Sequence, residues 1–236
     1  MSVTNTHSSH PLPVGSLRLD IFSQILLSIF TGEYPAGTRL KVQHLAKQYG
    51  VSTTPVREAI VELTGIGMVE LIPNRGAVVI PFGVSEIREM YHVRRILEVE
   101  SARCACKCID LEEIKHLLEM TRALHQTARD NQWAVLCSDI DRRMHTAIVN
   151  AAGIQRLKAE LTRYDRLMHM IRVVLKDSKR YLDQVLEEHL QVLEALLRRD
   201  QEAVATAMAG HLQATCDRAV EGIFICGISD PENIHS

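Results

Sequence analysis

The feature that most constrains this chain is a change of pattern at Pro81-Phe82-Gly83. Before that point, Gly and Pro repeatedly interrupt the sequence, whereas beyond it apolar residues recur at helical spacing almost to the C-terminus. We therefore predict two domains, of which the second is entirely helical. The predicted ranges are a flexible arm at 1–14, a first domain at 15–81, a helical domain at 82–228 and a tail at 229–236.

The helical domain is expected to be a bundle of long helices. Apolar periodicity places them at roughly 84–107, 111–129, 131–151, 154–177, 179–199 and 201–222. Aromatic residues make up only 4% of the chain, so the core must rest on aliphatic side chains, which suits helices packed on helices.

The first domain has the element order of a winged helix-turn-helix. Helices are predicted at 16–30, at 42–49 and from Thr54, as N-cap before Pro55, to Gly65 or Gly67. Strands at 68–72 and 77–80 follow, joined by the turn Pro73-Asn74-Arg75-Gly76. Three helices followed by a β-hairpin wing favour a domain that binds DNA. The fold class expected for the whole chain is thus mainly α.

Net charge and the absence of targeting signals bear on the cellular location of the protein but do not identify its binding partner. The formal net charge is -2, and residues 16–80 carry six Lys/Arg against five Asp/Glu. Net charge alone therefore does not indicate nucleic-acid binding. The chain shows neither a secretory h-region nor a membrane span, and we expect a cytoplasmic protein without a membrane partner. Its six Cys favour reduced thiols; Cys104 and Cys108, four residues apart, could hold a soft metal, but small buried thiols are the commoner case.

The candidate DNA contacts lie where a recognition helix begins and at the tip of the wing. Thr53, Thr54 and Arg57 occupy the first turn of the predicted third helix, whose N-terminal residues meet base edges or phosphates. A cation there opposes the helix dipole, which an anionic DNA partner would explain. Arg75 and Gly76 suit a wing that approaches the backbone. The alternative for Arg57 is an ion pair with Glu58 or Glu62 on a solvated face.

Four residues of the helical domain have metal-ligand spacing. Asp141 and His145 are one helical turn apart, about 5–6 Å at Cβ. The turn between the last two predicted helices centres on Asp200, whose residue type suits the N-cap of the helix that follows. His189 and His211 each lie eleven residues from Asp200, so in an antiparallel hairpin both are roughly 16 Å from the turn and lie at the same level. Three imidazoles and a carboxylate can bind a divalent metal. Isolated histidines on helices are, however, more often packed or solvated, and the chain has eleven.

The first domain closely resembles the GntR family of bacterial regulators. The residues that carry the resemblance are Gly32-x-Tyr34-x-x-Gly37-x-x-Leu40, Leu45-Ala46, Gly50-Val51-Ser52-x-x-Pro55-Val56-Arg57-Glu58-Ala59-Ile60, Leu63, Gly67 and Gly76. The family usually has an Arg where this chain has Thr53, and a basic residue where it has Gln43. These departures leave the DNA-binding fold intact, but the operator sequence and the affinity are not carried over from the family.

The helical domain resembles the FCD effector domain of the FadR branch of that family. The matching runs are Arg94-x-x-Leu97-Glu98, Asp141-x-x-Met144-His145-x-x-Ile148, Glu188-His189 and His211-Leu212. The resemblance implies a divalent metal on Asp141, His145, His189 and His211, with zinc, nickel, manganese and iron not separable by this ligand set.

The resemblance also implies how such a protein works. It points to a ligand-responsive transcription regulator rather than an enzyme, expected to be a repressor: a homodimer on a palindromic double-stranded operator that responds to a small organic acid. Arg94 and Arg172 can supply a cation for that acid, or can form salt bridges within the domain. Two alternatives remain: a metal-dependent, hydrolase-like enzyme, because such a site can activate water, and a regulator whose metal is purely structural.

Overall fold

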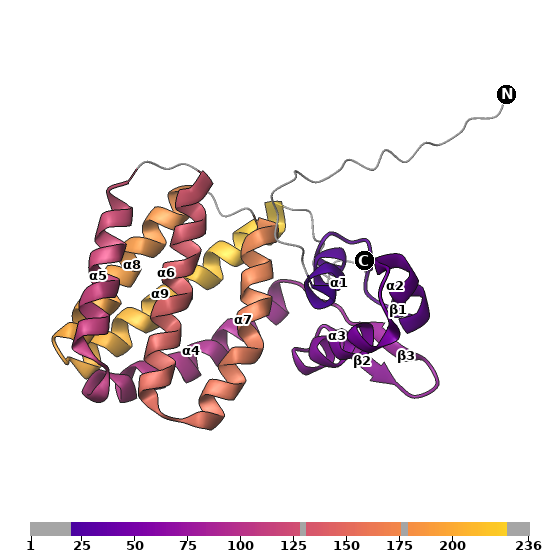
Figure 1. The fold of residues 1–236 in the computed structure, drawn as a ribbon, viewed down its shortest axis with the longest axis horizontal. Helices are drawn as coiled ribbons and strands as arrows, with labels where there is room; N and C mark the ends of the chain where they lie inside the picture. Colours follow the sequence, from indigo (N-terminus) through magenta and orange to yellow (C-terminus); the bar gives the residue numbers. More distant parts are fainter. Residues whose placement is uncertain (1–19, 128–130, 176–178, 226–236) are drawn as a thin grey trace.

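The computed structural model describes residues 20–127, 131–175 and 179–225. The predicted arm (1–14), the tail (229–236) and the first residues of the predicted helix at 16–30 lie outside this part of the chain. Within it the protein is mainly helical, with one small sheet, and the predicted order of a winged helix-turn-helix followed by helices is confirmed (Figure 1).

The winged helix-turn-helix consists of three helices and a three-stranded antiparallel sheet. Its elements are α1 (Ile21–Phe30), β1 (Arg39–Leu40), α2 (Val42–Tyr49), α3 (Thr53–Gly65), β2 (Val69–Ile72) and β3 (Gly76–Val79). The strand order is β1-β3-β2, so the hairpin predicted from the turn residues is present and its second strand lies in the centre.

Two local features differ from the sequence prediction. Helix α3 begins at Thr53, with Ser52 as N-cap, two residues earlier than the expected cap at Thr54. Pro55 tolerates this position because N–H groups in the first turn have no partner within the helix, so its missing donor costs nothing there. Strand β1 was not predicted: it has two residues, too few for an alternating pattern, and is fixed by pairing Arg39 with Val78.

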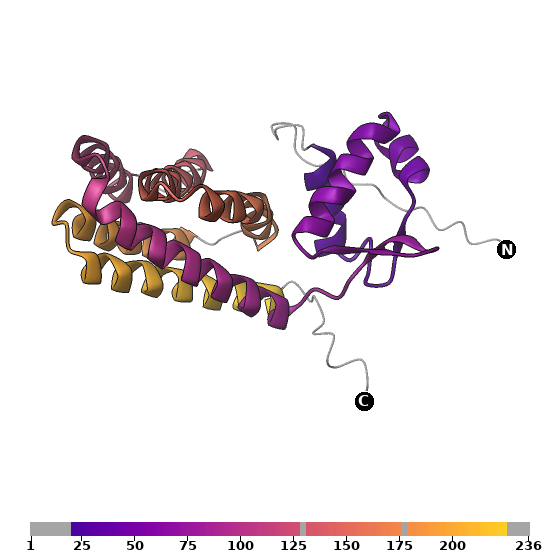
Figure 2. The same cartoon turned by 90° about the horizontal axis from the view of Figure 1, so that it is seen from below.

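The helical domain contains α4 (Val84–Cys108), α5 (Leu111–His125), α6 (Asn131–Ala152), α7 (Gln155–Leu175), α8 (Lys179–Leu197) and α9 (Gln201–Ile225). Helices α4 and α9 run side by side along their length, α8 packs on α9, and α6 lies across α4 (Figure 2). The buried core between them is aliphatic, including Ile114, Ile148, Leu196 and Leu212. Aliphatic side chains therefore fill this core, as the low aromatic content of the chain predicts.

The α8–α9 hairpin is closed by a capped turn that also contacts α4. Asp200 Oδ1 accepts a hydrogen bond from the Ala203 N–H at 3.0 Å, as the sequence predicted for an N-cap. Arg199, in the left-handed region at φ 57°, donates to the carbonyl oxygens of Cys106 and Ile109, both at 2.8 Å. These bonds hold the turn against the end of α4.

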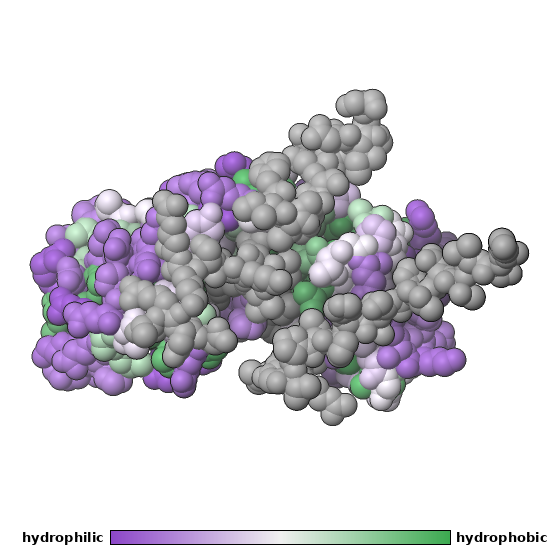
Figure 3. Space-filling model, turned by 90° about the horizontal axis from the view of Figure 1, so that it is seen from above, coloured by the Kyte–Doolittle hydropathy of each residue, from purple (hydrophilic) through white to green (hydrophobic). Residues whose placement is uncertain are grey.

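The two domains share one apolar cluster. Winged-helix residues such as Phe22 and Leu26 belong to the same buried group as Leu167 of α7 and Ala219 of α9, and α1 contacts α7. The face in Figure 3 is largely hydrophilic at both ends. None of the helices in the described ranges combines the length and the apolar character needed to cross a lipid bilayer.

Candidate metal centre and DNA-binding surface

Three helices bring Asp141, His145, His189 and His211 to one point. Helix α6 contributes Asp141 and His145 one turn apart, and the α8–α9 hairpin contributes His189 and His211 at matching depth. One ligand atom from each residue can be chosen so that all four lie within 4.8 Å of one another. His189 is 0%, His211 3% and Asp141 7% exposed, so the cluster is enclosed within the domain.

The three imidazoles turn their Nε2 atoms toward this point. His145 Nε2 lies 3.2 Å from His211 Nε2 and 3.6 Å from Asp141 Oδ1. His189 Nε2 lies 3.3 Å from the same Asp141 oxygen. Nitrogen atoms this close to one another without intervening polar groups are arranged as ligands of a shared cation are arranged.

Two of the imidazoles are backed by a carboxylate, which is in turn held by an arginine. His145 Nδ1 lies 2.5 Å from Glu98 Oε2, and Arg94 Nη2 lies 2.6 Å from Glu98 Oε1. His211 Nδ1 lies 2.8 Å from Glu188 Oε2, and the guanidinium of Arg218 donates to both oxygens of Glu188 at 2.8 Å. A carboxylate on Nδ1 favours the tautomer whose Nε2 is free to bind a metal.

His189 has no such support. Both of its ring nitrogens are buried and make no hydrogen bond to the residues that the structure describes. A buried polar atom without a partner costs about 1–3 kcal/mol. A metal ion bound at His189 Nε2 would remove part of that cost, so the residues present fit a divalent ion.

Burial and charge divide the imidazoles into two kinds. Burial lowers the pKa of His145, but the charges of Glu98 and Asp141 outweigh it and raise that pKa to about 10. Burial lowers the pKa of His189, and it lowers that of His211 to about 4 despite Glu188. Without metal, His145 therefore carries a proton at neutral pH, and the other two rings are neutral.

The backing carboxylates stay ionised despite burial. Burial raises the pKa of Glu98, but Arg94 and His145 lower it to about 2 overall. Burial likewise raises the pKa of Glu188, and Arg218 and His211 bring it down to about 2. Each carboxylate is thus a fixed negative charge behind an imidazole.

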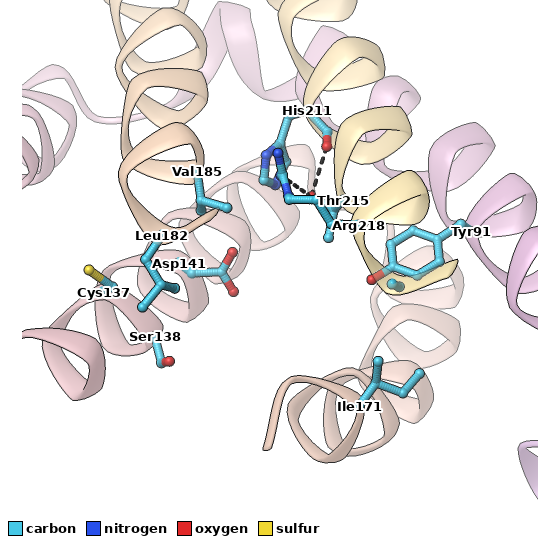
Figure 4. Close-up of a pocket in the computed structure, with 11 residues that line it drawn as sticks. Tyr91, Cys137, Ser138, Asp141, Ile171, Leu182, Val185, His211, Thr215 and Arg218 are labelled. Carbon is cyan, nitrogen blue, oxygen red and sulfur yellow. Dashed lines mark hydrogen bonds between the residues drawn. The ribbon is translucent and has the colours of Figure 1, made fainter. Parts of the chain in front are cut away.

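Two cavities adjoin the cluster. The larger, of about 550 Å³, reaches Glu98, Asp141 and His145 and is also lined by Lys158 of α7 and Ser23 of α1. A cavity of this size can hold a small organic molecule. The smaller, of about 30 Å³, is large enough for a water molecule and lies where Asp141 and His211 face each other across α6 and α9 (Figure 4).

Of the two predicted effector cations, Arg94 lines neither cavity. The Arg94 guanidinium is buried on Glu98 and over the Tyr91 ring, and the two cavities beside the cluster are lined by other residues. The side chain of Arg172 is outside the described part of the structure. Lys158 lines the larger cavity and makes no ion pair with any described residue.

The residues predicted to contact DNA lie at the start of α3 and at the wing. Thr54 and Arg57 are exposed and Thr53 half-exposed on the first turns of α3, and Arg75 and Gly76 are exposed at the wing. Arg57 makes no ion pair with Glu58 or Glu62 in the part of the chain that is described. Its charge is therefore available to a partner from outside.

Comparison with known proteins identifies the family of this chain. Residues 17–79 match the family model for bacterial regulatory proteins of the gntR family, and residues 89–214 match the model of the FCD domain. The chain belongs to the GntR family of regulators. It is a DNA-binding transcription regulator with an FCD domain, and the family and the relatives below are regulators rather than enzymes.

Relatives match along most of this GntR-family chain. The HTH-type regulator YdhC of Bacillus subtilis is 25% identical, over 84% of this chain and 89% of its own. The HTH-type transcriptional repressor RspR of Escherichia coli is 26% identical, over 75% of this chain and 77% of its own. The solved structure of McbR/YncC of E. coli superposes with a TM-score of 0.60 at 21% identity, covering 88% and 95% of the two chains, and shows the same fold.

Among the groups behind the metal ligands of this FCD domain, only Arg94 had a role predicted from the sequence, and its alternative role, a salt bridge within the domain, is the one observed. Glu98 and Glu188 stood within the matched runs, but only as family residues, and Arg218 was not singled out. A signal existed for one pair, because Arg94 and Glu98 are four residues apart on a helix. The approach of Glu98 to His145 depends on how α4 packs against α6, which no local pattern contains.

Proposed function

We propose that this regulator is a metal-dependent repressor whose FCD domain binds a small organic acid. The observation that carries the proposal is the convergence of Asp141, His145, His189 and His211 within 4.8 Å beside a cavity of about 550 Å³. Asp141 and the three imidazoles would hold the ion. When bound, a divalent ion supplies a concentrated positive charge with coordination positions left for oxygen donors.

The charges around the site favour an anionic effector. Three carboxylates and two guanidiniums surround the imidazoles and leave one net negative charge. A divalent ion among neutral imidazoles therefore makes the whole group net positive, and a carboxylate would neutralise it. In the same cavity, Lys158 is a candidate to bind a second anionic group of the effector.

The cavity also supports a route from effector to DNA. Ser23 belongs to α1 of the winged helix, yet it lines the cavity together with Lys158 of α7, and α1 packs on α7. A bound acid that contacts both helices would favour one arrangement of the two domains over another. Only such a difference in affinity between arrangements can shift the DNA-binding equilibrium.

We further propose that the protein acts as a homodimer on a palindromic operator. A two-fold operator presents two major-groove sites about one helical turn apart, and each protomer supplies one α3. Repression is supported by the relative RspR, which is named as a repressor. The acid would then relieve repression, by lowering the affinity for DNA.

The first experiment measures the metal content of purified protein. We expect about one divalent ion per chain in the wild type and a sharp fall in His189→Ala, because the remaining donors are too few to hold the ion. His116→Ala, which changes an exposed histidine of α5, is the matched control. Full metal content in both His189→Ala and His211→Ala would refute the site.

The second experiment tests the effector. Small carboxylic acids are screened for a rise in melting temperature, with and without chelator, and binding acids are then added to protein on its operator. The proposal expects stabilisation that chelator abolishes, weaker DNA binding and no consumption of the acid. Stabilisation that survives chelation would make the metal structural, and turnover of the acid would support the enzymatic alternative instead.

A further inference from the structure

The wing contains a second arginine beside its glycine, contributed by a different strand. Arg39 lies on β1 and pairs with Val78 of β3, and Gly76 lies two residues before Val78 on that strand. Residues two apart on a strand face the same side, and so do directly paired residues. Arg39 and Gly76 therefore share one face of the sheet.

The guanidinium of Arg39 extends along that face to the wing glycine. A Cβ built on Gly76 would lie 3.8 Å from both Nε and Nη2 of Arg39, so the charged group lies beside the glycine. Gly76 has a φ of 76°, which other residues rarely adopt. Its neighbour Arg75 is exposed, as are Gly76 and Arg39 themselves.

Neither arginine is neutralised by a residue that the structure describes. In the ranges that the structure describes, the side chains of Arg39 and Arg75 make no ion pair and no hydrogen bond. The acid on the same sheet, Glu70, pairs with Val78 from the opposite strand, so it lies two strand spacings from Arg39, roughly 10 Å. Two cations are thus presented at the same end of the wing, which projects away from the helical domain (Figure 1).

We propose that Arg39 is a DNA-phosphate contact that acts together with Arg75 on either side of Gly76. The occupant that fits is the phosphodiester backbone beside the groove entered by α3, because guanidinium groups bind phosphate oxygens and the bare glycine lets the backbone approach closely. The inference builds on the DNA-binding function of the family and assigns a role to a residue outside the recognition helix and the wing turn.

A phosphate contact has a recognisable energetic signature. It weakens with salt, since it releases condensed counterions, and it does not depend on base sequence. Loss of one such contact lowers the salt slope of binding by about 0.9 and the affinity at 0.1 M salt by roughly fivefold to tenfold.

The test compares Arg39→Gln with Arg198→Gln, which removes an exposed arginine from the helical domain. Binding is measured by fluorescence anisotropy between 50 and 200 mM KCl on several 30-bp duplexes, including the DNA upstream of the chain's own gene. We expect Arg39→Gln to weaken every duplex by a similar factor and to lower the salt slope by about 0.9 per protomer. Arg39→Lys, which keeps the charge, should restore most of the slope.

Three outcomes would overturn the inference. Titrations of Arg39→Gln that superimpose on those of Arg198→Gln would show that Arg39 does not touch DNA. A loss confined to one duplex would show base reading instead of a phosphate contact. If the wild type bound no duplex at all, the DNA-binding function would fail together with the inference. In that case Arg57→Ala, like Arg39→Gln, would leave the anisotropy unchanged.

Discussion

His145 and His211 resemble each other in how they are held, and differ in what they carry. Each has its Nδ1 beside a carboxylate that an arginine fixes from behind. Yet Glu98 and Asp141 together give His145 a raised pKa, while His211 stays neutral. At the residue scale, the site therefore combines one imidazole that must lose a proton with two that need not.

The first prediction concerns the backing carboxylates. Glu98→Gln and Glu188→Gln are each expected to lower the metal affinity of the protein with neutral imidazoles, corrected for proton competition, by about 10- to 100-fold, because an amide orients Nδ1–H less firmly and makes the ring a weaker donor. Competition with a chromophoric chelator measures the change. Glu100→Gln, an exposed position on the same helix, is the control and should bind metal like the wild type. Unchanged affinity in both variants would mean that the carboxylates do not orient the ligands.

The second prediction is the pH dependence of metal binding. The pKa of His145 is raised from its ordinary value of 6.5 to about 10, so the ring stays protonated up to about pH 10. A metal ion that binds below that pH must displace the proton. Affinity should therefore rise by about tenfold per pH unit from pH 7 to pH 9, with about one proton released per ion bound. Potentiometry on weakly buffered protein measures the release.

Glu98→Gln sharpens the pH test. Without the negative charge of Glu98, the pKa of His145 should fall, so metal affinity should level off at lower pH than in the wild type. A wild-type affinity that is already flat above pH 7 would contradict the assignment of the proton to His145.

At the scale of elements, the α8–α9 turn determines whether His189 and His211 lie at the same height along the two antiparallel helices. Their equal distance from Asp200 could be counted in the sequence, and the cap at Asp200 was predicted from its residue type. The anchoring of the turn on α4 by Arg199 was not, because its carbonyl acceptors lie about ninety residues away along the chain.

The third prediction tests that cap. Asp200→Ala should lower the free energy of unfolding by about 1 kcal/mol, since the Ala203 N–H loses its acceptor at the start of α9. Urea unfolding monitored by circular dichroism measures the loss. Arg198→Ala, at an exposed position next to the same turn, is expected to change stability by less than about 0.5 kcal/mol. Equal stability of the two variants would show that the cap contributes nothing.

Long periodic segments were predicted well, and short or packed features poorly. Helices of the FCD domain have apolar faces repeated over several turns, so their approximate ranges follow from spacing. Strand β1 has only Arg39 and Leu40, and its existence depends on β3. The four candidate ligands could be named from spacing and resemblance, whereas Glu98 and Glu188 acquire their contacts only when the bundle closes.

At the scale of the whole molecule, the fourth prediction is the assembly. We expect a homodimer, because one winged helix reads only half of a two-fold operator. Multi-angle light scattering at micromolar concentration should give twice the chain mass of 26.6 kDa, with or without DNA. A monomer that persists on DNA would overturn both the dimer and the palindromic operator.

The complete burial of His189 has a consequence in time. An ion bound to a ring with 0% exposure and to three further ligands is expected to leave slowly, because every ligand must release it, whereas a small acid in the 550 Å³ cavity has fewer contacts to break. Metal exchange should therefore take minutes or longer, while effector exchange is fast. On the proposed function, each protein molecule binds its metal ion once and retains it, whereas the acid binds and dissociates as its concentration changes.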